Sequence, residues 1–220
     1  TGSFTGQINA NNGVISSSAQ LPAGTVSASS QYPGWVTASS QIDFGSVVNK
    51  NGGIHVSAAE GSDWWRTTAY GFIHDDGHAL IKDFPNERSM EVAFMLDYAE
   101  QFDQCGIFIT HDDSHWIKAA VEFCDGFPQV GAVVTNELSD WSTGRVSEWV
   151  GKEVTMRVSR SGDAVTVRAS VGDDQRLVRV APLDPTKNWK AGPMVCAPSR
   201  AGLTVTITKW SEGEPDGALH

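Results

Sequence analysis

Alternation of apolar and polar residues, with a period of two, runs through most of the chain from about Val47 to Trp210. In the segment M-E-V-A-F-M-L, residues 90–96, every second side chain is a large apolar one. The same alternation recurs at residues 116–123, 154–158, 165–171 and 203–207. Successive side chains of a strand point to opposite faces of a sheet, so this pattern predicts half-buried β-strands.

Short turn sequences rich in Gly and Asp separate these segments. They are D-D-G at residues 75–77, D-G at 125–126, S-G-D at 161–163 and G-D-D at 172–174. Turns of this composition join neighbouring antiparallel strands. No stretch of a dozen residues carries an amphipathic helical pattern. We therefore predict an all-β jelly-roll sandwich of two antiparallel sheets with roughly ten strands or more.

Charge and the length of apolar runs exclude two classes of partner. Sixteen Lys and Arg oppose 26 Asp and Glu, which gives a net charge of −10. Such a chain repels a phosphate backbone, so we expect no nucleic-acid partner. No apolar run approaches the ~18–20 residues that cross a bilayer, so we expect no membrane insertion. The 3 cysteines cannot all pair, and none has C-x-x-C spacing, which favours a reducing compartment.

Residues 1–45 differ in composition from the rest of the chain. They contain no Lys, Arg or His and a single acid, Asp43, and related Ser-rich blocks recur at residues 16–20, 27–31 and 37–41. One interpretation is a flexible Ser/Gly-rich linker. The other is a thin repetitive shaft, because Val, Ile and Leu also recur and a fibre buries them against sister chains. The blocks and the T-G-S-F-T-G tract resemble repeats of bacteriophage tail-fibre and related virion proteins.

Further motifs, between residues ~47 and 210, are similar in order and spacing to a family called regulation of enolase protein. They are D-W-W-R (63–66), Y-G-F-I-H-D-D-G-H (70–78), Y-A-E-Q-F-D-Q-C-G (98–106), W-I-K-A-A-V-E-F (116–123), S-D-W-S (139–142) and A-G-P-M (191–194). That family lies in the concanavalin-A-like lectin/glucanase superfamily, so the resemblance implies two bent sheets with a groove on the concave one. We divide the chain into a shaft or linker (1–45), a concanavalin-like β-sandwich (46–212) and a C-terminal tail (213–220).

The strand predicted at residues 116–123 offers a candidate binding row. One face is wholly apolar and must be core, so Trp116, Lys118 and Glu122 share the opposite face. Sugar recognition needs an aromatic ring that stacks on a pyranose and polar groups that bind its hydroxyls, and this row supplies both. The alternative is structural, with Lys118 and Glu122 forming an ion pair on the sheet and Trp116 packing beside them.

Other aromatic and polar residues are predicted to line the same groove. Trp64 and Trp65 are adjacent on a strand, so one faces the core and the other the groove, and Arg66 shares the face of Trp64. Trp141 is expected in a loop, where an exposed tryptophan is costly unless it packs or binds. The predicted ligand-binding set is Trp64, Trp65, Arg66, Tyr70, Trp116, Lys118, Glu122, Asp140 and Trp141.

A glycoside hydrolase is the competing class of protein, because the superfamily contains glucanases. The resemblance implies an E-x-D-x-x-E motif for retaining enzymes of this fold, and the sequence lacks it. Ala120 stands beside Glu122 where a partner carboxylate is needed, although Asp103 and Asp140 could approach from loops. No G-x-S-x-G occurs, and the cysteines lie in apolar runs where an inert thiol is expected. We expect no enzymatic activity.

Two clusters of His and Asp, H-D-D-G-H at residues 74–78 and H-D-D-S-H at 111–115, have the residue types of metal ligands. Both lie between apolar strands, so we interpret them as turns. The two histidines of each cluster are four residues apart, a spacing that shares one face only in a helix. Concanavalin-like folds sometimes hold calcium in loops, so a structural calcium ion is the one ion considered and no other cofactor is expected.

Two functions are compatible with these features. The first is a carbohydrate- or receptor-binding head of a virion protein similar to a phage tail fibre, located in the virion and trimeric through residues 1–45. The alternative is a cytosolic concanavalin-like protein of sugar metabolism, regulatory or glycan-active, with a disordered N-terminal tail. The first predicts a stable elongated oligomer and the second does not.

Deletion of residues 1–45 tests the shaft. A monomer could not bury the recurring Val, Ile and Leu of this segment, so assembly must supply their contacts. The shortened chain should stay folded and become monomeric by light scattering. An oligomer of unchanged size after the deletion would show that the β-sandwich itself assembles.

Overall fold

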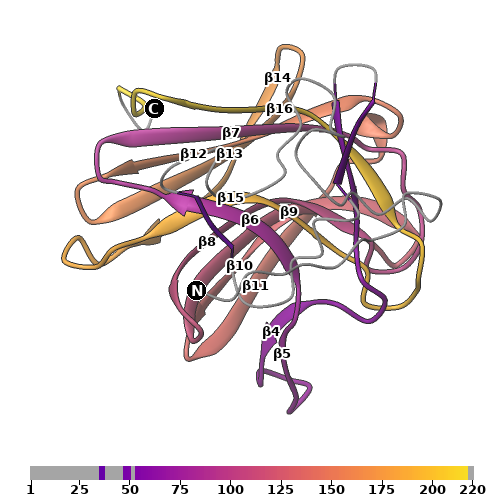
Figure 1. Cartoon of the computed structure of the whole chain (residues 1–220), viewed down its shortest axis with the longest axis horizontal. Helices are drawn as coiled ribbons and strands as arrows, with labels where there is room; N and C mark the ends of the chain where they lie inside the picture. The colour runs from indigo at the N-terminus through magenta and orange to yellow at the C-terminus, as the bar shows by residue number, and fades with distance from the viewer. Residues whose placement is uncertain (1–34, 38–46, 51–52, 218–220) are drawn as a thin grey trace, which may run out of the picture.

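The computed structural model describes residues 35–37, 47–50 and 53–217, which form two large sheets packed face to face (Figure 1). Sheet A has the strand order β1 (Trp35–Thr37), β6 (His78–Asp83), β15 (Lys190–Cys196), β8 (Gln104–Asp112), β9 (His115–Cys124), β10 (Phe127–Asn136) and β11 (Leu138–Arg145). Sheet B has the order β14 (Asp174–Pro182), β13 (Ala164–Val171), β12 (Glu153–Ser161), β7 (Arg88–Met95), β16 (Thr204–Gly213), β3 (Gly53–Ser57) and β2 (Val47–Lys50). A separate hairpin consists of β4 (Trp64–Arg66) and β5 (Ile73–Asp75), and Ser147–Trp149 forms a short 3-10 helix.

The prediction of an all-β sandwich of two antiparallel sheets is confirmed. The five alternating segments lie in β7, β9, β12, β13 and β16. The turns at 125–126, 161–163 and 172–174 join β9 to β10, β12 to β13 and β13 to β14, each an antiparallel neighbour. Among the described residues, no helix has the length and apolar character needed to cross a lipid bilayer.

The main hydrophobic core lies between the two sheets. Strand β7 contributes Met90, Val92 and Phe94 from sheet B, and β9 contributes Ile117 and Val121 from sheet A, all of them buried. Full burial of one such side chain stabilises the fold by about 1.5–3 kcal/mol. The prediction that the apolar face of β9 is core is therefore confirmed.

A second, smaller core lies on the opposite face of sheet A, where the β4–β5 hairpin packs. Figure 1 shows this hairpin on the side of sheet A that faces away from sheet B. The ring of Trp64 in β4 stacks on Phe108 of β8, with 4.1 Å between centroids, and Trp116 of β9 is buried beside them. The outer face of sheet A is thus partly covered by the hairpin, and the uncovered part holds the candidate site.

The predicted division of the chain at residues 1–45, 46–212 and 213–220 stays a prediction, because residues 1–34, 38–46 and 218–220 lie outside the described ranges. Among the described residues of the predicted tail, Gly213 is the last residue of β16 in sheet B, and Glu214 and Asp216 form ion pairs with that sheet. Glu214 pairs with Arg88 at 2.8 Å, and Asp216 pairs with Arg157 at 2.8 Å and with Arg168. These ion pairs attach residues 214–216 to β7, β12 and β13.

Gly106 in β8 tests the close packing of sheet A. A Cβ atom at this position would lie 2.0 Å from the carbonyl oxygen of Ala119 in the neighbouring strand. That contact is with backbone, so Gly106→Ala should lower the free energy of unfolding by about 1–3 kcal/mol in urea titrations. Gly144→Ala in the edge strand β11, where a Cβ atom would meet nothing within 4 Å, is the control and should change stability little. Equal effects of the two variants would contradict the described register.

Candidate functional site

A pocket of about 360 Å³ lies between the β4–β5 hairpin and the uncovered part of sheet A. We call it the hairpin pocket. Its floor comes from sheet A, one wall from the hairpin and the loop before β5, and another from strand β11. The lining residues are Asp63, Trp65, Tyr70, Phe72, His74, Phe102, Lys118, Glu122, Val133, Trp141, Pro198 and Ser199.

A buried ion pair forms part of the floor. The Nζ atom of Lys118, on β9, donates to Oδ1 of Asp63 at 2.7 Å, and the lysine side chain is only 4% exposed. Asp63 Oδ1 also accepts from the backbone N–H of Trp64 at 2.7 Å and from Nε2 of Gln104 at 3.2 Å. Burial alone lowers the pKa of Lys118, but the carboxylates of Asp63 and Glu122 outweigh burial and raise it. Lys118 is therefore charged in the folded protein.

Glu122 lies four residues further along the same face of β9 and is half-buried. Burial raises its pKa to about 7, and the carboxylates of Asp63 and Asp125 act in the same direction against the attraction of Lys118. Within the described part of the chain, no residue donates a hydrogen bond to this carboxyl group. The ion-pair partner of Lys118 is thus Asp63, and the alternative considered from the sequence, a Lys118–Glu122 ion pair, is not formed. Near neutral pH, Glu122 offers both a donor and an acceptor to a ligand.

The hairpin side of the pocket is a row of contacting rings. The ring of Trp65 meets Tyr70 edge-on at 5.5 Å between centroids, Tyr70 stacks on Phe72 at 5.4 Å, and Phe72 meets His74 at 4.9 Å. Tyr70 is 59% exposed and Phe72 44% exposed, whereas Trp65 is held by a hydrogen bond from its Nε1 to the carbonyl oxygen of Thr68. Trp141, which is 37% exposed, contributes a further ring from β11. The pocket therefore has an aromatic wall above a charged floor.

The structure brings part of the predicted set together in this pocket. The predicted residues that line it are Trp65, Tyr70, Lys118, Glu122 and Trp141. The predicted split between the adjacent tryptophans is seen only in part: both are buried in the small core, and Trp65 alone also lines the pocket. Trp141 was expected in a loop, but the structure places it in the edge strand β11, opposite Val133 of β10.

Trp116 does not reach the groove, which corrects the predicted binding row. Its side chain is 1% exposed, because the hairpin covers it and the Trp64 ring lies 6.3 Å away between centroids. The period-two pattern gives the face on which Trp116 lies but not what covers that face. A sugar cannot stack on a ring that is already enclosed by protein.

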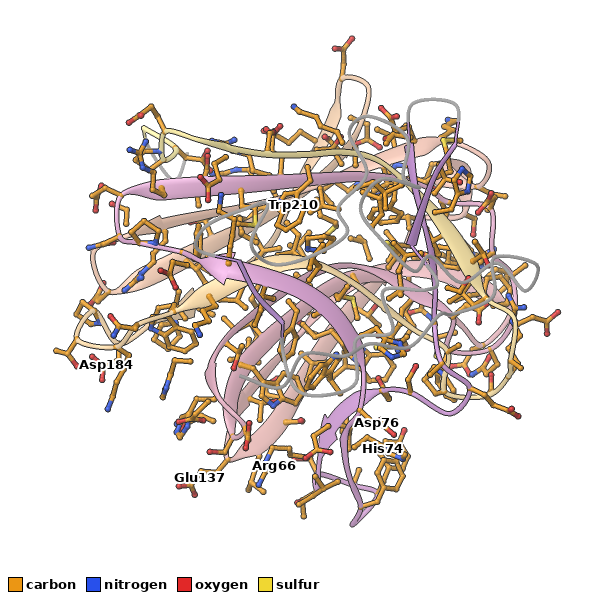
Figure 2. All side chains as sticks on the ribbon, viewed as in Figure 1. Arg66, His74, Asp76, Glu137, Asp184 and Trp210 are labelled. Carbon is orange, nitrogen blue, oxygen red and sulfur yellow. The ribbon has the colours of Figure 1, made fainter. Side chains whose placement is uncertain are left out.

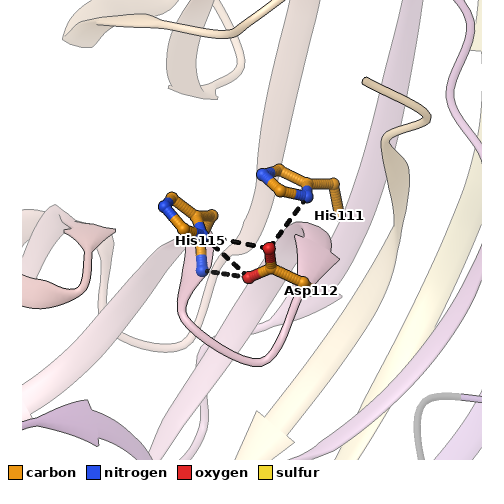
Figure 3. A group of neighbouring side chains, drawn as sticks. All are labelled: His111, Asp112 and His115. Atoms are coloured by element: carbon orange, nitrogen blue, oxygen red, sulfur yellow. Dashed lines mark hydrogen bonds and ion pairs between the residues drawn. The ribbon is translucent and has the colours of Figure 1, made fainter.

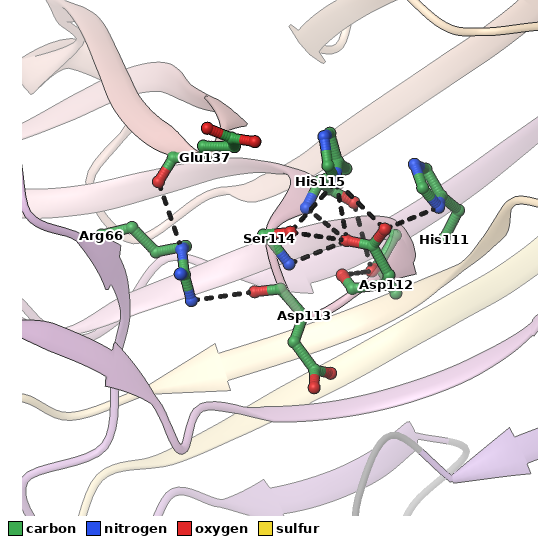
Figure 4. Close-up of polar contacts among 8 residues, drawn as sticks. Arg66, His111, Asp112, Asp113, Ser114, His115 and Glu137 are labelled. Atoms are coloured by element: carbon green, nitrogen blue, oxygen red, sulfur yellow. Dashed lines mark hydrogen bonds and ion pairs between the residues drawn. The ribbon is translucent and has the colours of Figure 1, made fainter.

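Two other predicted residues have structural contacts outside the pocket. Arg66 donates from Nε to the carbonyl oxygen of Glu137 at 3.2 Å and from a terminal nitrogen to that of Asp113 at 3.3 Å, so it ties the hairpin to the end of sheet A (Figures 2 and 4). Asp140 pairs with Arg179 of β14 at 3.0 Å. Neither side chain lines the hairpin pocket.

Seven lining residues were absent from the predicted set: Asp63, Phe72, His74, Phe102, Val133, Pro198 and Ser199. Asp63 opens the D-W-W-R motif, and its role depends on Lys118, 55 positions further along the chain. Phe72, just before β5, and His74, within it, are two residues apart, which places both on one face of the strand, and Tyr70 lies in the turn before them. The alternation in Y-G-F-I-H was therefore a usable signal for these two.

The cluster at residues 111–115 forms the turn between β8 and β9, as predicted, but its two histidines share one side (Figure 3). Nδ1 of His115 lies 2.8 Å from Oδ1 of Asp112, Nδ1 of His111 lies 3.1 Å from Oδ2, and the two rings stack with centroids 4.9 Å apart. The expectation that this spacing separates them outside a helix is wrong, because a register shift between Thr110 and Asp112 rotates the chain. Burial raises the pKa of Asp112, but hydrogen bonds from His115 and Ser114 outweigh it and lower the pKa to about 2.

In the other cluster, at residues 74–78, the two histidines have separate partners. His74 lies 3.5 Å from Asp76 and lines the hairpin pocket, whereas Nδ1 of His78 accepts from the backbone N–H of Ala59 at 3.1 Å. Figure 2 shows His74 and Asp76 together on the hairpin.

All three cysteines are free and buried. Burial raises the pKa of the Cys105 and Cys196 thiols well above the ordinary value and that of Cys124 to about 11. Protonated, enclosed thiols are poor nucleophiles.

The sequence matches a known family and a yeast relative over most of its length. The family described as "Protein of unknown function (DUF1349)" matches residues 43–215. Regulation of enolase protein 1 from Saccharomyces cerevisiae is 37% identical over 179 residues, which are 80% of this chain and 89% of the yeast protein.

Solved structures also share the fold. The crystal structure of a functionally unknown protein from Saccharomyces cerevisiae is similar with a TM-score of 0.73 and 33% identity, and the match covers 83% of this chain and 96% of that chain. The GH43 protein BlXynB from Bacillus licheniformis is similar with a TM-score of 0.64 and 9% identity over 81% of this chain and 36% of that chain. The last similarity concerns the fold alone and about a third of the larger chain.

Glu122→Gln tests the burial of the carboxyl group through the pH dependence of stability. The pKa is about 7 in the folded state against an ordinary 4.5, so ionisation disfavours folding. The resulting loss of folding stability is absent below about pH 4.5, grows between about pH 4.5 and 7, and reaches its full size above pH 7. The variant should therefore match the wild type near pH 4 and be more stable at pH 8, by at most about 3 kcal/mol.

Thermal melts of both proteins from pH 4 to 8 measure this difference. Glu153→Gln, which removes a carboxylate from the exposed start of β12, is the control for net charge. A stability gain of Glu122→Gln that is the same at every pH would contradict the raised pKa.

Proposed function

This chain belongs to the DUF1349 family, and on that premise we propose that its hairpin pocket binds a neutral sugar or short glycan in the service of sugar metabolism. The observation that carries the proposal is the combination of an exposed aromatic wall with a buried, charged floor in one pocket. We further propose a cytoplasmic location, which fits three free, buried cysteines.

The aromatic wall supplies the apolar half of sugar recognition. The rings of Tyr70, Phe72 and Trp141 are more than a third exposed, so protein does not cover them and a ligand could stack on them. A pyranose presents C–H groups on its faces, and burying them against a ring is favourable by about 25 cal/mol per Å². A volume of about 360 Å³ is within the usual range for small-molecule sites and suits one or two sugar rings.

The floor supplies the polar half. Lys118 donates hydrogen bonds, and the Glu122 carboxyl group, with a pKa of about 7, both donates and accepts near neutrality. Hydroxyl groups of a sugar need both kinds of partner. Because Asp63 already neutralises Lys118 and Glu122 adds negative charge on ionisation, the pocket favours a neutral ligand over a phosphorylated one.

The relatives favour the alternative function over the virion head. The yeast relative is named for regulation of enolase, an enzyme of sugar metabolism, and none of the similar proteins reported above is a virion protein. The tail-fibre resemblance rests on residues 1–45, of which only residues 35–37 are described, and the family match begins at residue 43. Carbohydrate binding is the part of the first function that the pocket supports.

Glycoside hydrolysis is a second candidate, and one observation favours it. Glu122 has the raised pKa of a general acid, and Asp63 places a second carboxylate in the same pocket. Against this, Asp63 Oδ1 already accepts from Trp64, Gln104 and Lys118, so that oxygen is committed to holding the structure. We therefore propose binding without hydrolysis. Product analysis after incubation with xylo-, gluco- and manno-oligosaccharides tests it, and cleavage that Glu122→Gln abolishes would establish an enzyme instead.

Trp141→Ala and Tyr70→Ala test the aromatic wall. Each variant removes a ring that stacks on the sugar, so affinity for a glycan identified on an array should fall about tenfold, which corresponds to about 1.4 kcal/mol. Calorimetric titration measures the affinity, and melting curves should change little because both rings are more than a third exposed.

Phe127→Ala is the matched control, since this ring is 38% exposed, close to the 37% of Trp141, but lies outside the pocket. Its affinity should equal that of the wild type. If no neutral sugar binds, or if all three variants bind equally well, the pocket is not a carbohydrate site.

A further inference from the structure

We propose that His111, Asp112 and His115 form a binding site for a divalent transition-metal ion, Zn²⁺ above all. The ligands would be the Nδ1 atoms of the two imidazoles and one carboxylate oxygen of Asp112. The site lies at the start of β9, whereas the hairpin pocket lies further along this strand, so the proposal is independent of sugar binding.

The donor atoms already have nearly the spacing of metal ligands. One atom from each of the three residues lies within 4.8 Å of the other two. Oδ2 of Asp112 is 3.1 Å from Nδ1 of His111 and 3.0 Å from Nδ1 of His115. Ligand atoms bound ~2.0–2.1 Å from a tetrahedral zinc ion lie roughly 3.3 Å from one another, so binding requires only small side-chain movements. Figure 3 shows both Nδ1 atoms directed at the carboxylate.

Surrounding contacts hold the side chains of Asp112 and His111 in place. Oδ1 of Asp112 accepts from the backbone N–H groups of Ser114 and His115, both at 2.8 Å (Figure 4). The His111 ring packs edge-on against Trp189, with 4.6 Å between centroids. An ordinary turn explains the backbone contacts of Asp112, because Asp commonly caps turns in this way. It does not require two imidazoles that face the same carboxylate.

The ligand types select the class of metal. Imidazole nitrogen is a preferred ligand of zinc, copper and nickel, whereas calcium and magnesium take oxygen ligands in larger numbers. The structural calcium ion considered from the sequence therefore does not suit these residues.

The site also borders a second pocket, of about 400 Å³, which Asp184, Lys187 and Trp189 help to line. Three protein ligands leave at least one coordination position of zinc for water or for a ligand in that pocket. We infer an exchangeable metal site rather than a closed structural one.

Calorimetric titration of the tag-free, metal-stripped full chain with ZnCl₂ tests the proposal. We expect saturable binding, and an affinity at least about tenfold weaker in His111→Ala and in His115→Ala, since each variant removes a ligand. Asp112→Asn keeps an oxygen that can accept from the turn but loses the carboxylate charge, so it should weaken zinc binding while the melting temperature changes little. Titration with Co²⁺ should give the strong visible absorption of a tetrahedral ion, and His111→Ala should lose it.

His74→Ala is the matched control, because His74 also faces a carboxylate, that of Asp76 at 3.5 Å, but without a second imidazole beside it. Its zinc affinity should equal that of the wild type. Melting curves establish that each variant is folded. The proposal is overturned if the wild type binds zinc no more tightly than a His111→Ala/His115→Ala variant, or if Asp112→Asn binds as tightly as the wild type.

Discussion

The buried ion pair between Lys118 and Asp63 joins the β4–β5 hairpin to sheet A, and the shape of the hairpin pocket depends on it. Asp63 immediately precedes β4, its backbone N–H donates to Asp76 at 3.0 Å, and its carbonyl oxygen accepts from Gly77 at 2.9 Å. One residue thus fixes both ends of the hairpin and compensates the buried lysine. Removal of one partner of such a pair typically costs about 3–5 kcal/mol, because it leaves a charge without compensation.

Strand β9 contributes side chains both to the main core and to the hairpin pocket. Ile117 and Val121 point into the main core, while the opposite face is divided along its length. Near the start of the strand the hairpin covers Trp116, and beyond that cover Lys118 and Glu122 meet the open pocket. The hairpin is short, so it covers part of the face and leaves the rest open as the hairpin pocket.

Sequence patterns predicted what depends on neighbours along the chain. Period-two alternation predicted the strands, and three of the four Gly–Asp turns join antiparallel neighbours as predicted, whereas the turn at 75–77 joins β5 to β6 of a different sheet. The polar face of β9 was placed correctly for Lys118 and Glu122, which both line the hairpin pocket. Alternation could not show that Trp64 covers Trp116, since that contact joins residues 52 positions apart in the numbering. Nor could it show the register shift beside Asp112, because a bulge breaks the very period on which the prediction relies.

Because the β4–β5 hairpin packs on sheet A with one side and lines the hairpin pocket with the other, the state of the pocket is coupled to local unfolding of the hairpin. One side of the hairpin packs Trp64 against Phe108, and the other presents Tyr70 and Phe72 to the pocket. Any excursion that lifts the hairpin from sheet A therefore destroys the pocket. An occupant of the pocket would oppose that excursion by a free energy that grows with the logarithm of one plus its free concentration over its dissociation constant. Slow amide exchange in β4 and β5 would then report occupancy of the pocket, even though the occupant touches few of the amides concerned.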